Sequence, residues 1–284
     1  MKFGVREICD VVLKAKSAQK IGNQTFEKDE PVIYFDSAKT STVEGAATTV
    51  YAQGGKGNSR LIAWEGERTV TFTMEDALIS PLGFAILSGA GIIDAGESSK
   101  INVHMTTQKE VAAADGAVTV DLTDVLPKNG ELVETAGLTY GFVLDESGNI
   151  SKRLGKGTAT KSAKTIAFAD TDLENETVIV LVDYYISMQS GVQQLEVTPD
   201  KFAGNYYLEA STLFRRQEDG VDMPAQFIIP NVKIQSAFNF SLASTGDPST
   251  FTFTMDAFPD YTKFDRTKKV LFALQIVEDF QQGQ

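Results

Sequence analysis

Acidic side chains alternate at Asp170, Asp172 and Glu174, where they could begin a calcium-binding loop. An EF-hand loop also needs a glycine at its sixth position and a bidentate glutamate at its twelfth. Those positions hold Asn175 and Leu181. The segment therefore favours a solvated acidic turn, and we expect no metal site.

A second acidic group could support glycosidic bond hydrolysis. Glu65, Glu67 and Glu75 share parity along a predicted strand, and Asp76 follows directly. Residues of one parity lie on one face of a strand, so these carboxylates could share a face. Glycosidases, however, use a pair of carboxylates at a fixed separation. The cluster alone does not predict a hydrolase.

Two aromatic residues near this cluster, Trp64 and Tyr51, could form a stacking platform for a sugar ring. Large aromatic side chains also dominate cores and protein interfaces. We favour packing in a core or an interface, and a carbohydrate-binding adhesion module stays an alternative that exposure of both rings would support.

The chain contains one cysteine, Cys9, and one histidine, His104. One cysteine excludes an internal disulfide framework and a thiolate zinc cluster, and one histidine excludes a multi-histidine metal site. A Ser-His-Asp or Cys-His mechanism would have to use His104, which lies in an apparent strand and favours a structural role.

The glycine-rich segments 53–58 and 155–157 lack the GxxxxGK[ST] pattern of a phosphate-binding loop. We therefore predict a protein that is not an enzyme, with no catalytic, cofactor-binding or metal-binding residues and no cofactor.

Composition limits the partners. The chain has 284 residues, 42% of them hydrophobic, and a formal net charge of −12. Such a chain can bury a large core as one or two domains. It would repel nucleic acid on average, because phosphate binding needs basic surfaces. No apolar run is long enough to span a bilayer, so no membrane partner is expected.

Alternating hydrophobicity predicts a mainly β fold built on antiparallel hairpins. The clearest hairpin spans 224–260, where apolar residues alternate on both sides of a turn at 246–248. Residues 1–36 predict a strand pair, with a helix over 5–16 as the competing interpretation. Further strands are expected at 61–74, 194–198, 206–213 and 270–277, and a polar loop is expected within 37–60.

One helix is predicted over 76–89, because Ser80-Pro81 is a favourable start and Gly89 or Gly91 can end it. Residues 105–176 are poorer in aromatic residues and predict a small β subdomain inserted into the main fold. We expect the apolar run 177–186 to return to the main core, so the core would comprise residues 1–104 and 177–284.

Segments 68–77 and 249–258, RTVTFTMEDA and STFTFTMDAF, are alike. They could be an internal pseudo-repeat. Amphipathic strands with threonine on the outer face can also resemble each other by chance.

Three blocks of the sequence, residues 32–91, 197–230 and 231–260, resemble the tail tube proteins of large tailed bacteriophages. They include VIYFDSAKTSTVEGAATTVYAQGG, NYYLEASTLFRRQEDGVDMPAQFIIP and NVKIQSAFNFSLASTGDPSTFTFTMDAFPD. Together they cover roughly half of the chain, with 105–176 outside them.

The resemblance implies an antiparallel β-barrel or β-sandwich with one flanking helix. It implies a structural virion protein, made in the host cytoplasm, that self-assembles into stacked hexameric rings. The resulting tube would conduct genomic DNA during ejection without binding it specifically, and sheath, tape-measure and baseplate proteins would be partners. The inserted subdomain would lie outside the ring. Another virion role, as a capsid-associated or decoration protein, is the main alternative.

Overall fold

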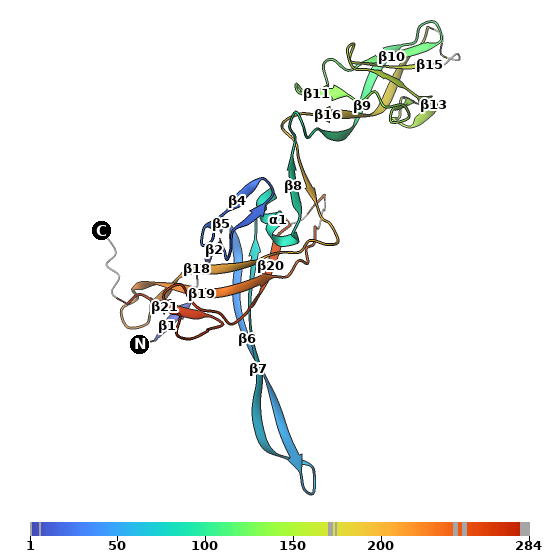
Figure 1. Ribbon diagram of the computed structural model, residues 1–284. Helices are drawn as coiled ribbons and strands as arrows, with labels where there is room; N and C mark the ends of the chain where they lie inside the picture. Colours follow the sequence, from blue (N-terminus) through green and yellow to red (C-terminus); the bar gives the residue numbers. More distant parts are fainter. Residues whose placement is uncertain are drawn as a thin grey trace. The chain divides into compact units, whose positions relative to one another are not determined.

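The computed structural model describes residues 2–5, 7–169, 173, 175–240, 244–245 and 249–278. The chain forms two compact units, one of Met1–Ile92 with Leu195–Gln284 and one of Ile93–Gln194 (Figure 1). Both are built from antiparallel strands, and one helix occurs in the described residues. The predicted mainly β class is confirmed, and no sheet in the described part closes into a barrel.

The first unit contains a nine-stranded sheet whose main path runs β5-β2-β18-β19-β20-β7-β6. Beside this path, β1 pairs with β18 and β21 pairs with β19, while β3 and β4 form a separate hairpin. The bounds are β1 Phe3–Val5, β2 Asp10–Ala15, β3 Gln19–Ile21, β4 Gln24–Phe26, β5 Pro31–Phe35, β6 Ala38–Gly54, β7 Ser59–Asp76, β18 Asn205–Arg216, β19 Asp222–Ile234, β20 Phe251–Ala257 and β21 Ala273–Ile276.

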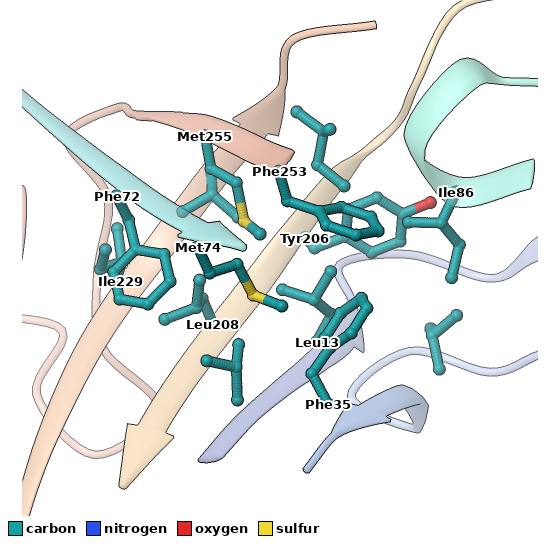
Figure 2. Packing of buried hydrophobic residues seen from close by; sticks show 14 of the residues in the cluster. Leu13, Phe35, Phe72, Met74, Ile86, Tyr206, Leu208, Ile229, Phe253 and Met255 are labelled. Carbon is teal, nitrogen blue, oxygen red and sulfur yellow. The ribbon is translucent and has the colours of Figure 1, made fainter. Parts of the chain in front are cut away.

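Alternation along the strands creates the core of this unit. Val11, Leu13 and Ala15 of β2 are buried while the residues between them are more exposed. The predicted strand pair in residues 1–36 is confirmed, because β2 pairs with β5, and the helical interpretation of 5–16 is wrong. Strands β2, β5, β7, β18 and β20 all contribute large side chains to one buried cluster. Figure 2 shows this cluster, which includes Leu13, Phe35, Phe72, Met74, Leu208, Phe253 and Met255.

Helix α1, Pro81–Ser88, is the predicted helix, with a later start than the expected residue 76. Residue 76 still belongs to strand β7, so the helix cannot begin there and begins after its N-cap residue, Ser80. The Ser80 hydroxyl accepts the Gly83 amide at 3.0 Å. Gly89 ends the helix with φ 73°, and a Cβ there would lie 2.5 Å from the backbone of Phe202. The helix end therefore requires glycine.

The two look-alike segments are neighbouring strands of one sheet. β20 pairs with β7, with Phe253 opposite Met74 and Met255 opposite Phe72. All four of these side chains are fully buried. The shared pattern thus corresponds to two strands that cover the same core from adjacent positions.

The hairpin predicted over 224–260 forms in a reduced version. β19 and β20 pair only through residues 232–234 and 255–257, because β19 ends at Ile234. The continuation of the strand through Phe238 and Phe240 is wrong. These two rings instead pack against Phe84 of α1, with centroids 5.1 and 5.2 Å from it. The turn predicted at 246–248 lies outside the described residues.

The second unit has a five-stranded sheet ordered β11-β16-β12-β13, with β9 also paired to β16, and a three-stranded sheet β10-β15-β14. Side chains from both sheets fill one cluster that includes Val118, Phe168, Val182 and Tyr184. Its strands are β9 Ile101–Ala112, β10 Ala117–Asp121, β11 Gly130–Leu132, β12 Tyr140–Leu144, β13 Ile150–Lys156, β14 Thr158–Thr160, β15 Thr165–Ala169 and β16 Thr177–Met188. β8 Gly91–Asp94 and β17 Gln193–Glu196 pair with each other.

The expected return of 177–186 to the main core is wrong. Strand β16 pairs with β9 along its whole length, from Thr177 opposite Ala112 to Met188 opposite Ile101. Its buried residues belong to the core of the second unit. The units divide at 92/93 and 194/195, whereas the sequence predicted an inserted subdomain over 105–176. An apolar strand could be buried in the core of either unit. The strand with which it pairs, here β9, determines the unit to which it belongs.

Candidate assembly surface

The segment 37–60, expected to be a polar loop, forms strand β6 and the tip of a long hairpin. β6 and β7 pair from residues 38 and 76 out to residues 54 and 59 (Figure 1). Threonine, valine and alanine dominate β6, and the first two favour strands. The expectation of a loop is wrong because both faces of β6 are largely exposed, so its sequence lacks the alternation that marks a half-buried strand.

Only the inner half of the hairpin belongs to the core. Val70, Phe72 and Met74 of β7 are buried. Between residues 59 and 69, β7 is exposed at every position, on both faces. We call this exposed part, residues 45–54 and 59–69, the arm. An isolated two-stranded ribbon has marginal stability in water, so a second molecule packed against the arm would stabilise it.

A bulge changes which residues share a face of the arm. Ala47 lies opposite Arg68 but Thr49 lies opposite Glu65, so β7 has one extra residue here. The Glu67 amide donates to the Thr48 hydroxyl at 2.9 Å. A Cβ at residue 66 would lie 2.4 Å from that same hydroxyl oxygen, which explains the glycine at this position.

The bulge separates the carboxylates that the sequence suggested could share a face. Because of the extra residue, Glu65 turns to the side of Arg68, and their charged groups lie 3.8 Å apart. Arg68 has the parity of the core-facing residues, whereas Glu75 has the other parity. Glu65 and Glu75 therefore lie on opposite faces of the hairpin, and the suggested shared face is wrong for Glu65, whereas Glu67 keeps the parity of Glu75.

One face of the arm carries an apolar stripe, which we define as Val50, Ile62 and Trp64. Val50 lies opposite Trp64, and Ile62 lies opposite Ala52 two positions farther along the same face. The three side chains are 62%, 55% and 53% exposed. Contiguous apolar groups at this exposure are typical of an interaction surface.

Tyr51 lies on the other face of the arm. It is opposite Ala63, so its side chain points away from Val50 and Trp64. The guanidinium of Arg60 lies 4.1 Å from the centre of its ring. Trp64 and Tyr51 are both exposed, but they lie on opposite faces and cannot form one stacking platform for a sugar ring. The carbohydrate-binding alternative depended on that platform and is not supported.

The cysteine and the histidine occupy separate units. Cys9 is buried, and its backbone amide donates to the Ser41 hydroxyl at 2.8 Å. Burial raises the pKa of the Cys9 thiol, which disfavours the reactive thiolate. His104 lies on β9, with its Nε2 3.0 Å from a carboxylate oxygen of Asp183 on the neighbouring strand. Its ring packs against Tyr185 with centroids 5.3 Å apart.

The alternating acids Asp170, Asp172 and Glu174 lie outside the described residues. Across the described ranges, no three histidine, cysteine or acidic side chains are placed to hold a metal ion. The glycine-rich segment 53–58 forms the tip of the arm. Residues 155 and 156 end strand β13, and residue 157 separates it from β14. No helix in this part of the chain is long and apolar enough to cross a membrane.

Comparison with known proteins identifies the family of this chain. No curated protein matches the sequence. The model of the YomU/Tube protein family matches residues 5–270, which include the whole arm, the second unit and most of the first unit. The chain therefore belongs to the YomU/Tube protein family, a membership that supports the expected phage tube-like structural protein and virion component.

Proposed function

We propose that this chain is a tail tube protein that self-assembles into stacked rings, hexameric as the sequence resemblance implies, and so forms a conduit for DNA ejection. The observation that carries the proposal is the arm, whose apolar stripe is exposed on a ribbon that a single copy leaves uncovered. Family membership over nearly the whole chain supports the same function.

A second copy is the partner that suits the stripe. The stripe side chains are each about half exposed, and full burial of such a side chain contributes roughly 1.5–3 kcal/mol. Covering all three would then contribute on the order of 3 kcal/mol per interface. A ring or tube repeats that interface for every subunit, so a modest contact suffices for a cooperative assembly.

The charge of the chain suits a conduit. A net charge of −12 opposes binding of the phosphate backbone. DNA would pass along an anionic lining without being held. Sheath, tape-measure and baseplate proteins are the further partners that this role entails, and the protein would act in the phage tail without catalysis or a cofactor.

Electron microscopy of the purified chain over a concentration series tests the proposal. Stacked rings or hollow tubes are expected for the unmodified protein. The double variant Val50→Ser/Trp64→Ser should stay monomeric at concentrations where the unmodified chain assembles. Tyr51→Ser is the matched control, because it removes an aromatic ring from the opposite face of the same arm. Monomers of the unmodified chain at every concentration would refute self-assembly.

A further inference from the structure

The loop 261–269 is held in one conformation by its own hydrogen bonds. Asp260 and Val270 close it with two backbone bonds of 3.1 and 2.9 Å. Inside the loop, the Asp265 amide donates to the Thr262 hydroxyl at 3.0 Å, and the Thr267 amide donates to the Asp265 carboxylate at 2.8 Å. An ion pair between Asp260 and Lys16 fixes the loop to the end of β2. A loop ordered in this way loses little entropy on binding.

This loop presents the most exposed large apolar side chain in the described residues. Phe264 is 96% exposed, whereas the next in rank, Leu78, is 71% exposed. The loop also carries four basic residues against one acid, Asp265, in a chain of net charge −12. The basic residues are Lys263, whose ammonium lies 3.7 Å from Asp29, and Arg266, Lys268 and Lys269. A rigid aromatic knob with a cationic rim is typical of the anchor residues that dominate protein interfaces.

The same unit contains a cavity of about 460 Å³ with the complementary character. It lies at the other end of β2, between residues 7–10 and strands β18, β19 and β21. Its apolar lining includes Ile8, Leu213, Pro224 and Val277, and its acidic lining residues are Glu7 and Asp10. The nearby Arg215 is held by Asp222 through two bonds of 2.6 Å.

We propose that Phe264 of one copy inserts into this cavity of a second copy, with Arg266 against Glu7. The phenyl ring matches the apolar lining, and the basic rim of the loop matches the acidic lining. The volume is within the range of cavities that hold a buried ligand group. The occupant is therefore a second copy of this chain, identified by complementary charge and shape.

The contact is head-to-tail. Lys16, which holds the loop, and Asp10, which lines the cavity, are six positions apart along one strand direction, a separation of about 20 Å at the rise of a β-strand. Knob and cavity thus lie at distinct places on one unit, and a contact between distinct patches closes into a ring or continues as a filament. The inference rests on the proposed self-assembly and names a second contact that sustains it.

The test measures the concentration at which the full-length chain assembles, by sedimentation velocity. Phe264→Ser should raise that concentration by about tenfold to a hundredfold, whereas Phe264→Leu, which keeps an apolar knob, and Leu78→Ser, which removes apolar surface elsewhere, should change it little. Ser211→Trp or Gln275→Trp, each filling the cavity, should act like Phe264→Ser.

Charge reversal identifies the partners. Arg266→Glu and Glu7→Arg should each weaken assembly, and the double variant Arg266→Glu/Glu7→Arg should recover it. Assembly of Phe264→Ser at the unmodified concentration, or failure of the double variant to recover, would overturn the contact while leaving self-assembly through the arm intact. An unmodified chain that never assembles would overturn both proposals.

Discussion

The substitution Gly66→Ala should greatly weaken assembly while leaving the fold almost as stable as before. The added Cβ would lie 2.4 Å from the Thr48 hydroxyl oxygen, nearer than side chains tolerate. The hydroxyl must move away and release the Glu67 amide that it accepts at 2.9 Å. Both groups are exposed, so water replaces the lost bond and the direct cost is about 1 kcal/mol. In a unit of this size that lowers the unfolding midpoint by roughly 2–4 °C.

The effect on assembly should be much larger because the bulge sets the face on which the stripe lies. If the bulge moves toward the tip to relieve the clash, the pairing of residues 62–65 slips by one position, and Trp64 and Ile62 turn to the opposite face. Losing a contribution on the order of 3 kcal/mol per interface raises the assembly concentration roughly a hundredfold. Calorimetry measures the first effect, and sedimentation velocity with electron microscopy measures the second.

A compensating substitution at Thr48 tests whether the clash is the cause. In Gly66→Ala/Thr48→Ala the clashing oxygen is gone, and the next neighbouring atom of Thr48, its carbonyl oxygen, lies 3.4 Å from the new Cβ. This double variant should assemble nearly as the unmodified chain does. If Gly66→Ala alone assembles normally, the bulge does not orient the interface. If the double variant fails as well, the clash is not the cause.

Three further outcomes are expected. Phe253→Ala should cost about 3–5 kcal/mol of unfolding free energy in chemical denaturation, because the ring is fully buried and packs 4.8 Å from Phe35; a loss under 1 kcal/mol would contradict that packing. The hydrogen bond from Lys16 lowers the pKa of Asp260 below its ordinary value of 3.8, so the stabilisation is complete above about pH 4 and is lost as pH falls through the lowered value. Asp260→Asn should remove that acid-dependent step from a stability titration, and an unchanged profile would exclude this ion pair as its source. Because the Cys9 thiol is buried and burial raises its pKa, it should react with a thiol reagent at pH 8 much more slowly than a free thiol does; labelling as fast as a free thiol would show that it is accessible.

Local patterns predicted those parts of the fold in which one face of an element is buried. The alternation in β2 and β20 and the Ser80-Pro81 start of α1 each carry a signal within a few residues. The strand predicted at 61–74 is confirmed as part of β7. Strand β6 carries no such signal, because both of its faces are largely exposed. Its sequence has the appearance of a loop, although its backbone pairs throughout.

Features that depend on distant pairing were not accessible to the sequence. The face of the hairpin on which Glu65 and Trp64 lie depends on a bulge. The bulge becomes visible only when the pairing of β6 with β7 is known. The unit to which β16 belongs depends on β9, far away along the chain. Parity within one strand could not reveal either, because each is a property of two segments together.

The pairing of β8 with β17 has a consequence for how the second unit can be gained, lost or exchanged. The Ala95 amide donates to the Val192 carbonyl at 2.9 Å, and the Gln193 side chain donates to Asp94 at 2.6 Å. The two ends of the inserted segment are therefore neighbours. A turn of a few residues could join them in place of the whole segment. Recombination at this point could swap one cassette for another, or remove it, while the arm and the sheet that carries it keep their sequence.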